Sequence, residues 1–312
     1  MIINTGLRTD IPAFFSKWFL NRIDEGYVYV RNPYYKNQVL SYRLDPEVVD
    51  CIMFCTKNPK PLLKDHESLS KFNQYWHVTI TPYEREIEPN VPPIKDVIKS
   101  FKALSDKFDE EKVTLRYDPI FINQKYTLDY HIEAFEDIVS SLSNYTNNVI
   151  ISFIDLYKKT QRNFPGVKAV TDYERLKIGE EFSKITDYYK LNLKTCVEGD
   201  DLAQFGVDCT GCMTKEVVEK ALGRNMRIKA KKVRHGQCNC LLNNDIGSYN
   251  TCNHGCIYCY ANANKNLVNK NLKRHNPNSP LLLGEPRERD KVIKAKQRSF
   301  FTNEKSRQTK LY

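Results

Sequence analysis

The sequence predicts an α/β fold in which short parallel strands alternate with helices and form a partial or complete (βα) barrel. Two observations lead to this prediction. Apolar, β-rich runs recur along the first 195 residues, and amphipathic stretches with a helical period lie between them. Charged and polar residues follow many of these runs, which is typical of parallel strands whose carboxyl ends form a binding face.

The expected strands are short and bounded by polar residues. Residues 2–4 form the first, and residues 27–31 and 38–42 predict a hairpin around Asn32-Pro33. The continuous apolar run at 51–56 is typical of a buried strand. Similar runs predict further strands at 76–81, 112–116, 149–153 and 192–195.

The expected helices lie between these runs, at 11–22, 94–108, 127–142 and 173–188. Residues 94–108 place Val97, Phe101 and Leu104 on one face, as in a helix packed on a sheet. Thr127 is a suitable N-cap for the helix that follows it.

The 312-residue chain has 41% hydrophobic and 28% charged residues, the composition of an ordinary globular protein. It contains no run of about 20 apolar residues and no secretory pattern at its N-terminus, so we expect a cytoplasmic protein with no membrane segment. We predict three parts: a barrel domain (1–195), a cysteine-rich segment packed on the barrel mouth (196–264) and a basic C-terminal tail (265–312), extended over the domain or partly disordered.

The ten cysteines are unevenly distributed, with eight of them between positions 196 and 259. Disulfides do not persist in the cytoplasm, so metal binding is the expected reason for this clustering. Cys51 and Cys55 lie in an apolar strand, where a free cysteine behaves as a small hydrophobic residue.

Cys252, Cys256 and Cys259 are separated by three and then two residues. Thiolates at this spacing can hold three irons of a [4Fe-4S] cluster and leave the fourth iron open to a ligand. Gly255 allows the backbone to approach the cluster. A zinc site that also uses His254 or another cysteine is the alternative.

Four other cysteines, Cys196, Cys212, Cys238 and Cys240, would together make a four-thiolate site. We expect a second iron–sulfur cluster there, for electron transfer or substrate binding. A structural zinc ion is the alternative.

Residues at the expected strand ends are the candidates for catalysis and cofactor binding. The catalytic candidates are Arg8, Asp10, Lys57, Arg116 and Asp118, and the cofactor-binding candidates are Thr79, Asp155, Glu198, Tyr258 and Tyr260. Arg, Lys and Asp at one face suit a zwitterionic, polyhydroxyl ligand, and the two tyrosines could shield a cluster or stack on an adenine ring. The alternative is that Arg8–Asp10 and Arg116–Asp118 are local ion pairs that close loops.

A CxxxCxxC motif followed by an aromatic residue resembles the signature of the radical S-adenosylmethionine enzymes. This resemblance implies a (βα) barrel and a [4Fe-4S] cluster whose open iron is chelated by S-adenosylmethionine. It also implies a reducing partner of the flavodoxin or ferredoxin type and reductive cleavage to a 5′-deoxyadenosyl radical. In that superfamily the motif usually follows the first strand, whereas here it comes late, which indicates a permuted barrel or a capping C-terminal loop.

Along almost its whole length the chain resembles the domain-of-unknown-function family eighteen-forty-eight. The matching pieces are RTDIPAF (8–14), VRNP (30–33), FCTKNP (54–59), EPNVPP (88–93), RYDPI (116–120), ISFIDLYKK (151–159), YNTCNHGCIYCYAN (249–262) and PNSPLLLGE (277–285). The family pattern favours Cys212 over Cys209 for the second site. It implies an architecture and leaves the substrate open.

The basic charge belongs to the tail: residues 265–312 carry 13 Lys or Arg and 4 Asp or Glu, out of a net +10 for the chain. The YCYAN sequence is also similar to spore photoproduct lyase, which acts on DNA, and a basic tail attracts phosphates. Three hypotheses follow. The leading one is a radical enzyme with an unidentified substrate. The others are a radical lyase or repair enzyme that acts on nucleic acid, which the nearly neutral residues 1–264 disfavour, and a non-catalytic iron–sulfur or zinc protein.

Overall fold

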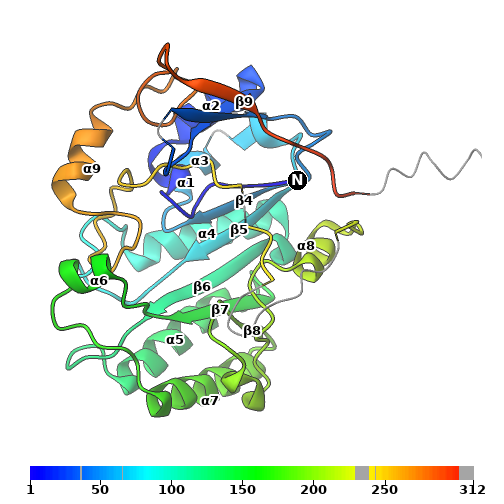
Figure 1. The fold of residues 1–312 in the computed structure, drawn as a ribbon. Helices are drawn as coiled ribbons and strands as arrows, with labels where there is room; N and C mark the ends of the chain where they lie inside the picture. The colour runs from blue at the N-terminus through cyan, green and yellow to red at the C-terminus, as the bar shows by residue number, and fades with distance from the viewer. Residues whose placement is uncertain (36, 65, 229–238, 243, 302–312) are drawn as a thin grey trace, which may run out of the picture.

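The computed structural model of the chain describes residues 1–35, 37–64, 66–228, 239–242 and 244–301. Its centre is one sheet with helices against one face, and a smaller sheet lies at one end of the molecule (Figure 1). No helix in the described ranges combines the length and apolar character needed to cross a membrane.

The central sheet has six strands, all parallel, in the order β1-β4-β5-β6-β7-β8. They are β1 (Ile2–Asn4), β4 (Cys51–Thr56), β5 (Gln74–Thr79), β6 (Val113–Ile120), β7 (Asn148–Phe153) and β8 (Asn192–Thr195). Because the strands run in one direction, all their carboxyl ends lie at one edge. The predicted parallel α/β fold is confirmed. Among the described residues β1 and β8 do not pair, so the sheet is open and does not form a closed barrel.

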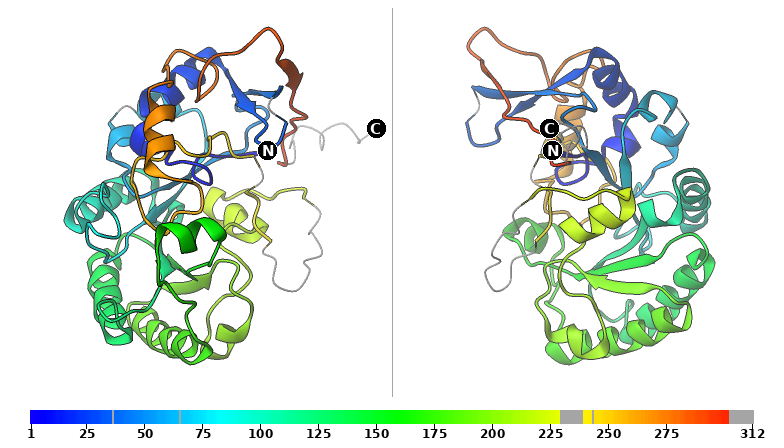
Figure 2. Two further views of the ribbon diagram at one scale, coloured as in Figure 1. Left: turned by 60° about the vertical axis from the view of Figure 1, so that its left-hand side comes forward. Right: turned by 90° about the vertical axis from the view of Figure 1, so that its right-hand side faces the viewer.

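Helices α4 (Ile94–Phe108), α5 (Leu128–Leu142) and α7 (Asp172–Tyr188) cover one face of this sheet (Figure 2). Their apolar faces meet the outward side chains of the strands in one core, where the rings of Phe135 and Phe182 stack at 3.6 Å. Each fully buried side chain of this kind contributes about 2–3 kcal/mol. Thr127 caps α5 as predicted, and its hydroxyl accepts the N–H of Tyr130 at 3.2 Å.

The cysteine-rich segment covers part of the opposite face. Cys212, Met213 and Val218 pack against Met53 and Tyr75 of the sheet. The segment includes α8 (Lys215–Leu222) and reaches both edges of the sheet. Asp208 forms a parallel bridge beside β8, and Asp245 forms one beside β1. The segment therefore spans the gap between the two edge strands.

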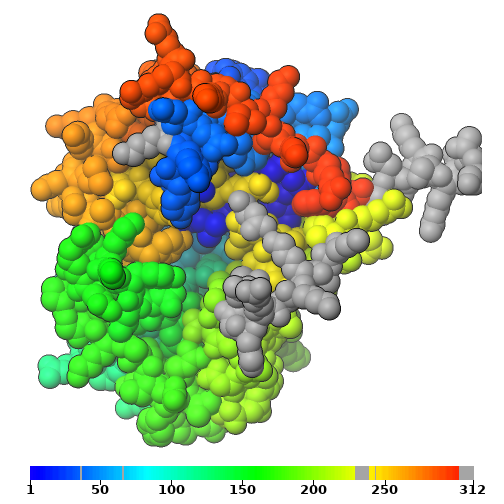
Figure 3. Space-filling view, viewed as in Figure 1, coloured from blue at the N-terminus to red at the C-terminus, as the bar shows by residue number. Residues whose placement is uncertain are grey.

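The small sheet joins the predicted hairpin to the C-terminal segment. It consists of β2 (Tyr27–Arg31), β3 (Gln38–Arg43) and β9 (Lys291–Lys294), in that order. The sequence predicted an extended tail after residue 264, but residues 265–301 contain α9 (Lys265–Leu272) as well as β9, and they lie against the N-terminal residues (Figure 3). The indole N–H of Trp18 donates to the Ser279 carbonyl at 2.9 Å, and Leu281 and Leu282 are buried.

Several boundaries differ from the prediction. The helix expected at 11–22 is divided at Phe15 into α1 (Ile11–Phe14) and α2 (Ser16–Glu25), because Phe15 has φ −131° and ψ 25°. β5 begins and ends two residues earlier than expected, and β6 continues through Asp118 to Ile120. The remaining elements are short: α3 (Lys60–Leu63), α6 (Lys158–Asn163) and 3₁₀ turns at His66–Leu69, Glu110–Lys112 and Asp201–Phe205.

Candidate functional site

The loop that contains Cys252, Cys256 and Cys259 lies at the carboxyl-end edge of the sheet. Three loops that follow strands hold this cysteine loop (residues 250–263). After β1, the Leu7 carbonyl accepts the hydroxyl of Tyr260 at 2.6 Å; after β5, the Ile87 carbonyl accepts the N–H of Ile257 at 3.0 Å. In α6, which follows β7, the Thr160 hydroxyl donates to the Tyr258 carbonyl at 3.3 Å.

The cysteine loop is also held by bonds within itself. The side chain of Asn262 donates to the Cys252 carbonyl at 2.8 Å, and the N–H of Asn250 donates to the Ala261 carbonyl at 3.1 Å. Asn250 and Gly255 have φ values of +60° and +74°, a region that asparagine and glycine enter more readily than other residues. The positive φ explains the glycine at position 255, and the approach of its backbone to a cluster stays a prediction.

The three thiols of the cysteine loop lie near one another and are half-buried. Burial, the Asp10 carboxylate and the other two thiols raise the pKa of Cys252 well above its usual value. Burial also raises the pKa of Cys259, although the N–H groups of Ala261 and Asn262 oppose it. Burial therefore favours the protonated thiols, and a metal that binds here would displace their protons.

Asp10 connects the cysteine loop to the sheet. Its carboxylate caps α1 by accepting the N–H of Ala13 at 3.0 Å. It also accepts the Thr56 hydroxyl at 2.7 Å, the N–H of Lys57 at 2.8 Å and Nε2 of His254 at 2.8 Å. Both oxygens are engaged, so Asp10 is placed to position other residues.

The contact between His254 and Asp10 also bears on the alternative that the cysteine loop binds zinc. One ring nitrogen of His254 is occupied by Asp10, and the ring packs edge-on against Phe14 at 4.6 Å. Within the ranges that the structure covers, no three His, Cys, Asp or Glu side chains are arranged to hold a single metal ion.

Lys57 and Glu88 form a buried ion pair next to the cysteine loop. The ammonium of Lys57 donates to Glu88 at 2.8 Å and to the Thr81 hydroxyl at 2.9 Å. The hydroxyl of Tyr258 donates to the same Glu88 oxygen. Burial alone would lower the pKa of Lys57, but Glu88 and Cys256 outweigh it and raise the pKa. Lys57 therefore carries its charge beside Cys256.

Sequence reasoning did not identify Glu88 as a site residue. The only local signal was an acidic residue at the start of EPNVPP, a proline-rich loop after a strand. Its side chain is 2% exposed and accepts three hydrogen bonds, which marks it as a structural centre of this edge.

Arg116 and Asp118 form a local ion pair, with Nη2 of Arg116 2.6 Å from Oδ2 of Asp118. Such a pair was the alternative to a catalytic role for these two residues. The pair lies near the second group of cysteines. Burial would lower the pKa of Arg116, but Asp118, Cys196 and Cys212, in that order, raise it well above its usual value. Arg8 does not pair with Asp10 and instead lies 3.8 Å from Asp245.

Three of the four cysteines expected at the second site are adjacent. The sulfur of Cys212 is 3.4 Å from that of Cys196 and 3.5 Å from that of Cys240. The N–H of Met213 donates to the Cys240 sulfur at 3.3 Å. Cys238 lies outside the described residues. Cys209 is half-buried, and its thiol contacts the Val207 carbonyl.

The other candidates are distributed along the same edge. Thr79 ends β5 and is buried, and Asp155 is exposed after β7. Glu198 belongs to a separate network, since its carboxylate accepts Arg175 of α7 at 2.6 Å and the N–H of Phe153 at 2.8 Å. The structure thus brings Lys57 to the cysteine loop, which itself contains Tyr258 and Tyr260, and it places Glu198 against α7.

These features define an α/β protein with an open parallel sheet and a cysteine-rich loop at the carboxyl ends of its strands. The chain belongs to the family described as Domain of unknown function (DUF1848), whose model matches residues 2–261. The match ends shortly after Cys259 and so includes both groups of cysteines. A search of curated proteins and a search of solved structures gave no match.

Proposed function

We propose that the protein is an iron–sulfur enzyme whose Cys252, Cys256 and Cys259 hold a [4Fe-4S] cluster for radical S-adenosylmethionine chemistry on an unidentified substrate. The observation that carries the proposal is the cysteine loop itself: three neighbouring thiols at the carboxyl ends of parallel strands. In α/β proteins this edge is where ligands bind.

The surroundings of the thiols suit a cluster. Backbone N–H groups of Ala261 and Asn262 face the Cys259 sulfur, and hydrogen bonds to sulfur tune the potential of iron–sulfur clusters. When bound, the cluster would supply the electron that cleaves S-adenosylmethionine to a 5′-deoxyadenosyl radical, with a flavodoxin or ferredoxin as donor. The chain's own residues hold this site in place: Asp10 fixes His254, and Glu88 fixes Lys57 and Tyr258.

The late position of the motif is compatible with a permuted arrangement. Residues 244–246 lie beside β1 at the sheet edge, with the N–H of Asn4 donating to the Asn244 carbonyl at 2.9 Å and a parallel bridge from Asn4 to Asp245. The cysteine loop follows this edge segment a few residues later. The cysteine loop therefore comes directly after the outermost parallel segment at this edge of the sheet. In the superfamily that the motif resembles, the motif likewise follows the first strand.

We also propose that Cys196, Cys212 and Cys240, with Cys238, hold a second iron–sulfur cluster. Two sulfur–sulfur distances of 3.4 and 3.5 Å and the nearby Arg116 support a thiolate site, because a buried cation stabilises the negative charge of thiolates. The cluster would serve electron transfer or substrate binding, and structural zinc remains the alternative.

The decisive experiment is anaerobic reconstitution with iron and sulfide, followed by reduction in the presence of S-adenosylmethionine. We expect release of 5′-deoxyadenosine from the wild-type protein and none from Cys256→Ala. Cys209→Ala is the matched control, because Cys209 is half-buried and belongs to neither site. Absence of 5′-deoxyadenosine from protein with a spectroscopically intact cluster would overturn the proposed activity.

A further inference from the structure

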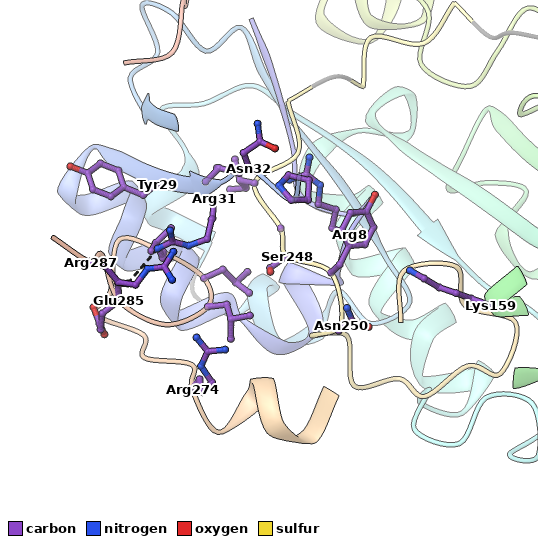
Figure 4. Close-up of a pocket in the computed structure, with 18 residues that line it drawn as sticks. Arg8, Tyr29, Arg31, Asn32, Lys159, Ser248, Asn250, Arg274, Glu285 and Arg287 are labelled. Carbon is purple, nitrogen blue, oxygen red and sulfur yellow. Dashed lines mark hydrogen bonds between the residues drawn. The ribbon is translucent and has the colours of Figure 1, made fainter. Parts of the chain in front are cut away.

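A cavity of about 550 Å³ opens beside the cysteine loop, between segments that are distant in sequence (Figure 4). Its walls come from the end of β2 (29–33), from residues 246–250 and from the C-terminal residues 281–287. Arg8, Lys159 and Arg274 complete the lining. The cavity is within the size range of small-molecule sites, about 300–1,000 Å³.

The lining is strongly cationic. Five of its side chains are positively charged: Arg8, Lys159, Arg31, Arg274 and Arg287. Glu285 is the acidic residue of this lining, and Asp245 and Asp290 pair with lining arginines from behind. Lys159 and Arg274 are therefore the two cations of this lining that have no carboxylate partner among the described residues.

Asp290 holds two of the arginines in fixed positions. It accepts two hydrogen bonds from Arg31, each 2.6 Å long, and three from Arg287: from the backbone N–H at 2.8 Å, from Nε at 3.3 Å and from Nη2 at 3.1 Å. The Asp290 side chain is 1% exposed, so this arrangement is built into the fold. Figure 4 shows Arg31 and Arg287 next to each other on one wall. Arginines fixed in this way lose little entropy when they bind an anion.

Two more cations of the lining lie near one aromatic ring. The Arg8 guanidinium lies 5.6 Å from the centre of the Tyr249 ring, and the Lys159 ammonium lies 5.4 Å from it. Arg274 is exposed at the rim, and its guanidinium makes no hydrogen bond or ion pair with any residue that the structure describes. The site therefore has fixed cations within and an uncommitted one at the entrance.

We infer that this cavity binds the phosphate group of a small phosphate monoester. Clustered arginines match a dianionic phosphate by charge and by the fork geometry of their N–H groups. Leu283 and the Tyr29 and Tyr249 rings supply apolar surface for the rest of the molecule. A nucleic-acid strand fits less well, because Glu285 lies in the lining and the site is a cavity of limited volume.

The cavity is also connected to the cysteine loop. Arg8 precedes Asp10 by two residues, Asn250 precedes Cys252 by two, and Lys159 donates to the Tyr260 carbonyl at 3.2 Å. A phosphate bound here would place the attached molecule beside that loop. This assignment as a substrate site rests on the proposed function, whereas phosphate binding itself does not.

Binding can be tested on the full chain by calorimetry with inorganic phosphate and ribose 5-phosphate, using ribose as the uncharged control. We expect ribose 5-phosphate to bind, ribose not to bind, and the affinity to fall at least tenfold in an Arg8→Gln/Arg274→Gln variant. Arg274→Glu alone, at an exposed position, should weaken binding without any effect on folding. Arg43→Gln, an exposed arginine of β3 outside the cavity, is the matched control and should bind like the wild type.

Unchanged affinity in both cavity variants would overturn the inference. It would also be overturned if a short single-stranded oligonucleotide or S-adenosylmethionine bound with the same dependence on Arg8 and Arg274 while ribose 5-phosphate did not bind. Because the assay needs neither iron nor reductant, its failure is distinct from failure of the proposed function, which is measured by release of 5′-deoxyadenosine.

Discussion

Replacing Asp10 with alanine should destabilise the whole protein and loosen the cysteine loop. The change removes an N-cap, which costs about 1 kcal/mol, and leaves the buried partners His254 and Thr56 without an acceptor, at about 1–3 kcal/mol each. We expect a total loss of about 4 kcal/mol in the free energy of unfolding. For a chain of this size that corresponds to a fall in Tm of about 5–10 °C.

The assay is thermal unfolding of the purified chain, combined with iron analysis after reconstitution. Asp10→Ala should bind less iron than the wild type, because the His254 contact that anchors the cysteine loop is lost. Asp24→Ala, an exposed residue of α2, is the control and should match the wild type in both measurements. If Asp10→Ala had a Tm within about 2 °C of the wild type and full iron content, the anchoring role of Asp10 would be refuted.

Three further predictions concern the same edge of the sheet. Glu88→Gln removes the counter-charge of Lys57 and should lower the free energy of unfolding by about 3–5 kcal/mol in urea titrations. The same change in a Lys57→Met background should lower it by much less, and equal losses in both backgrounds would exclude energetic coupling between Glu88 and Lys57. Burial raises the pKa of Asp245 to about 6, above the ordinary 3.8, so the folded state keeps this proton longer than the unfolded chain does. The free energy of unfolding should therefore fall by up to about 3 kcal/mol as the pH rises from about 4 to 6, and an unchanged pH profile in Asp245→Asn would contradict this. Cys212→Ala should reduce the iron content from about eight to about four per chain, whereas loss of zinc would show that the second site is structural.

The elements that the sequence predicted well are those with a strong local pattern. The apolar run of β4 and the helical period of α4 show burial directly, and Thr127 has the side chain that a helix start needs. The expectation that polar strand-end residues gather at one edge follows from parallel pairing alone. It placed Lys57 correctly beside the cysteine loop.

The features that the sequence did not reveal depend on contacts between distant residues. All four residues of β9 are exposed and two of them are lysines, so its pairing with β3 leaves no pattern of buried apolar residues to detect. Glu88 is buried because Lys57 and Tyr258 reach it from other loops, and no spacing within EPNVPP indicates that. The division of the first helix at Phe15 is likewise set by packing, since Phe15 is 2% exposed in the main core.

The anchoring of the cysteine loop implies that cluster binding is coupled to the complete fold. Its contacts come from residues that precede it by as many as 253 positions, as in the bond from Tyr260 to Leu7, and from loops after three different strands. The loop can adopt this conformation only when those strands have paired, so a preformed thiol site does not exist in a partly folded chain. Under the proposed function, the free energy of cluster binding would therefore stabilise the whole sheet, because a ligand that binds only the folded state shifts the equilibrium towards it.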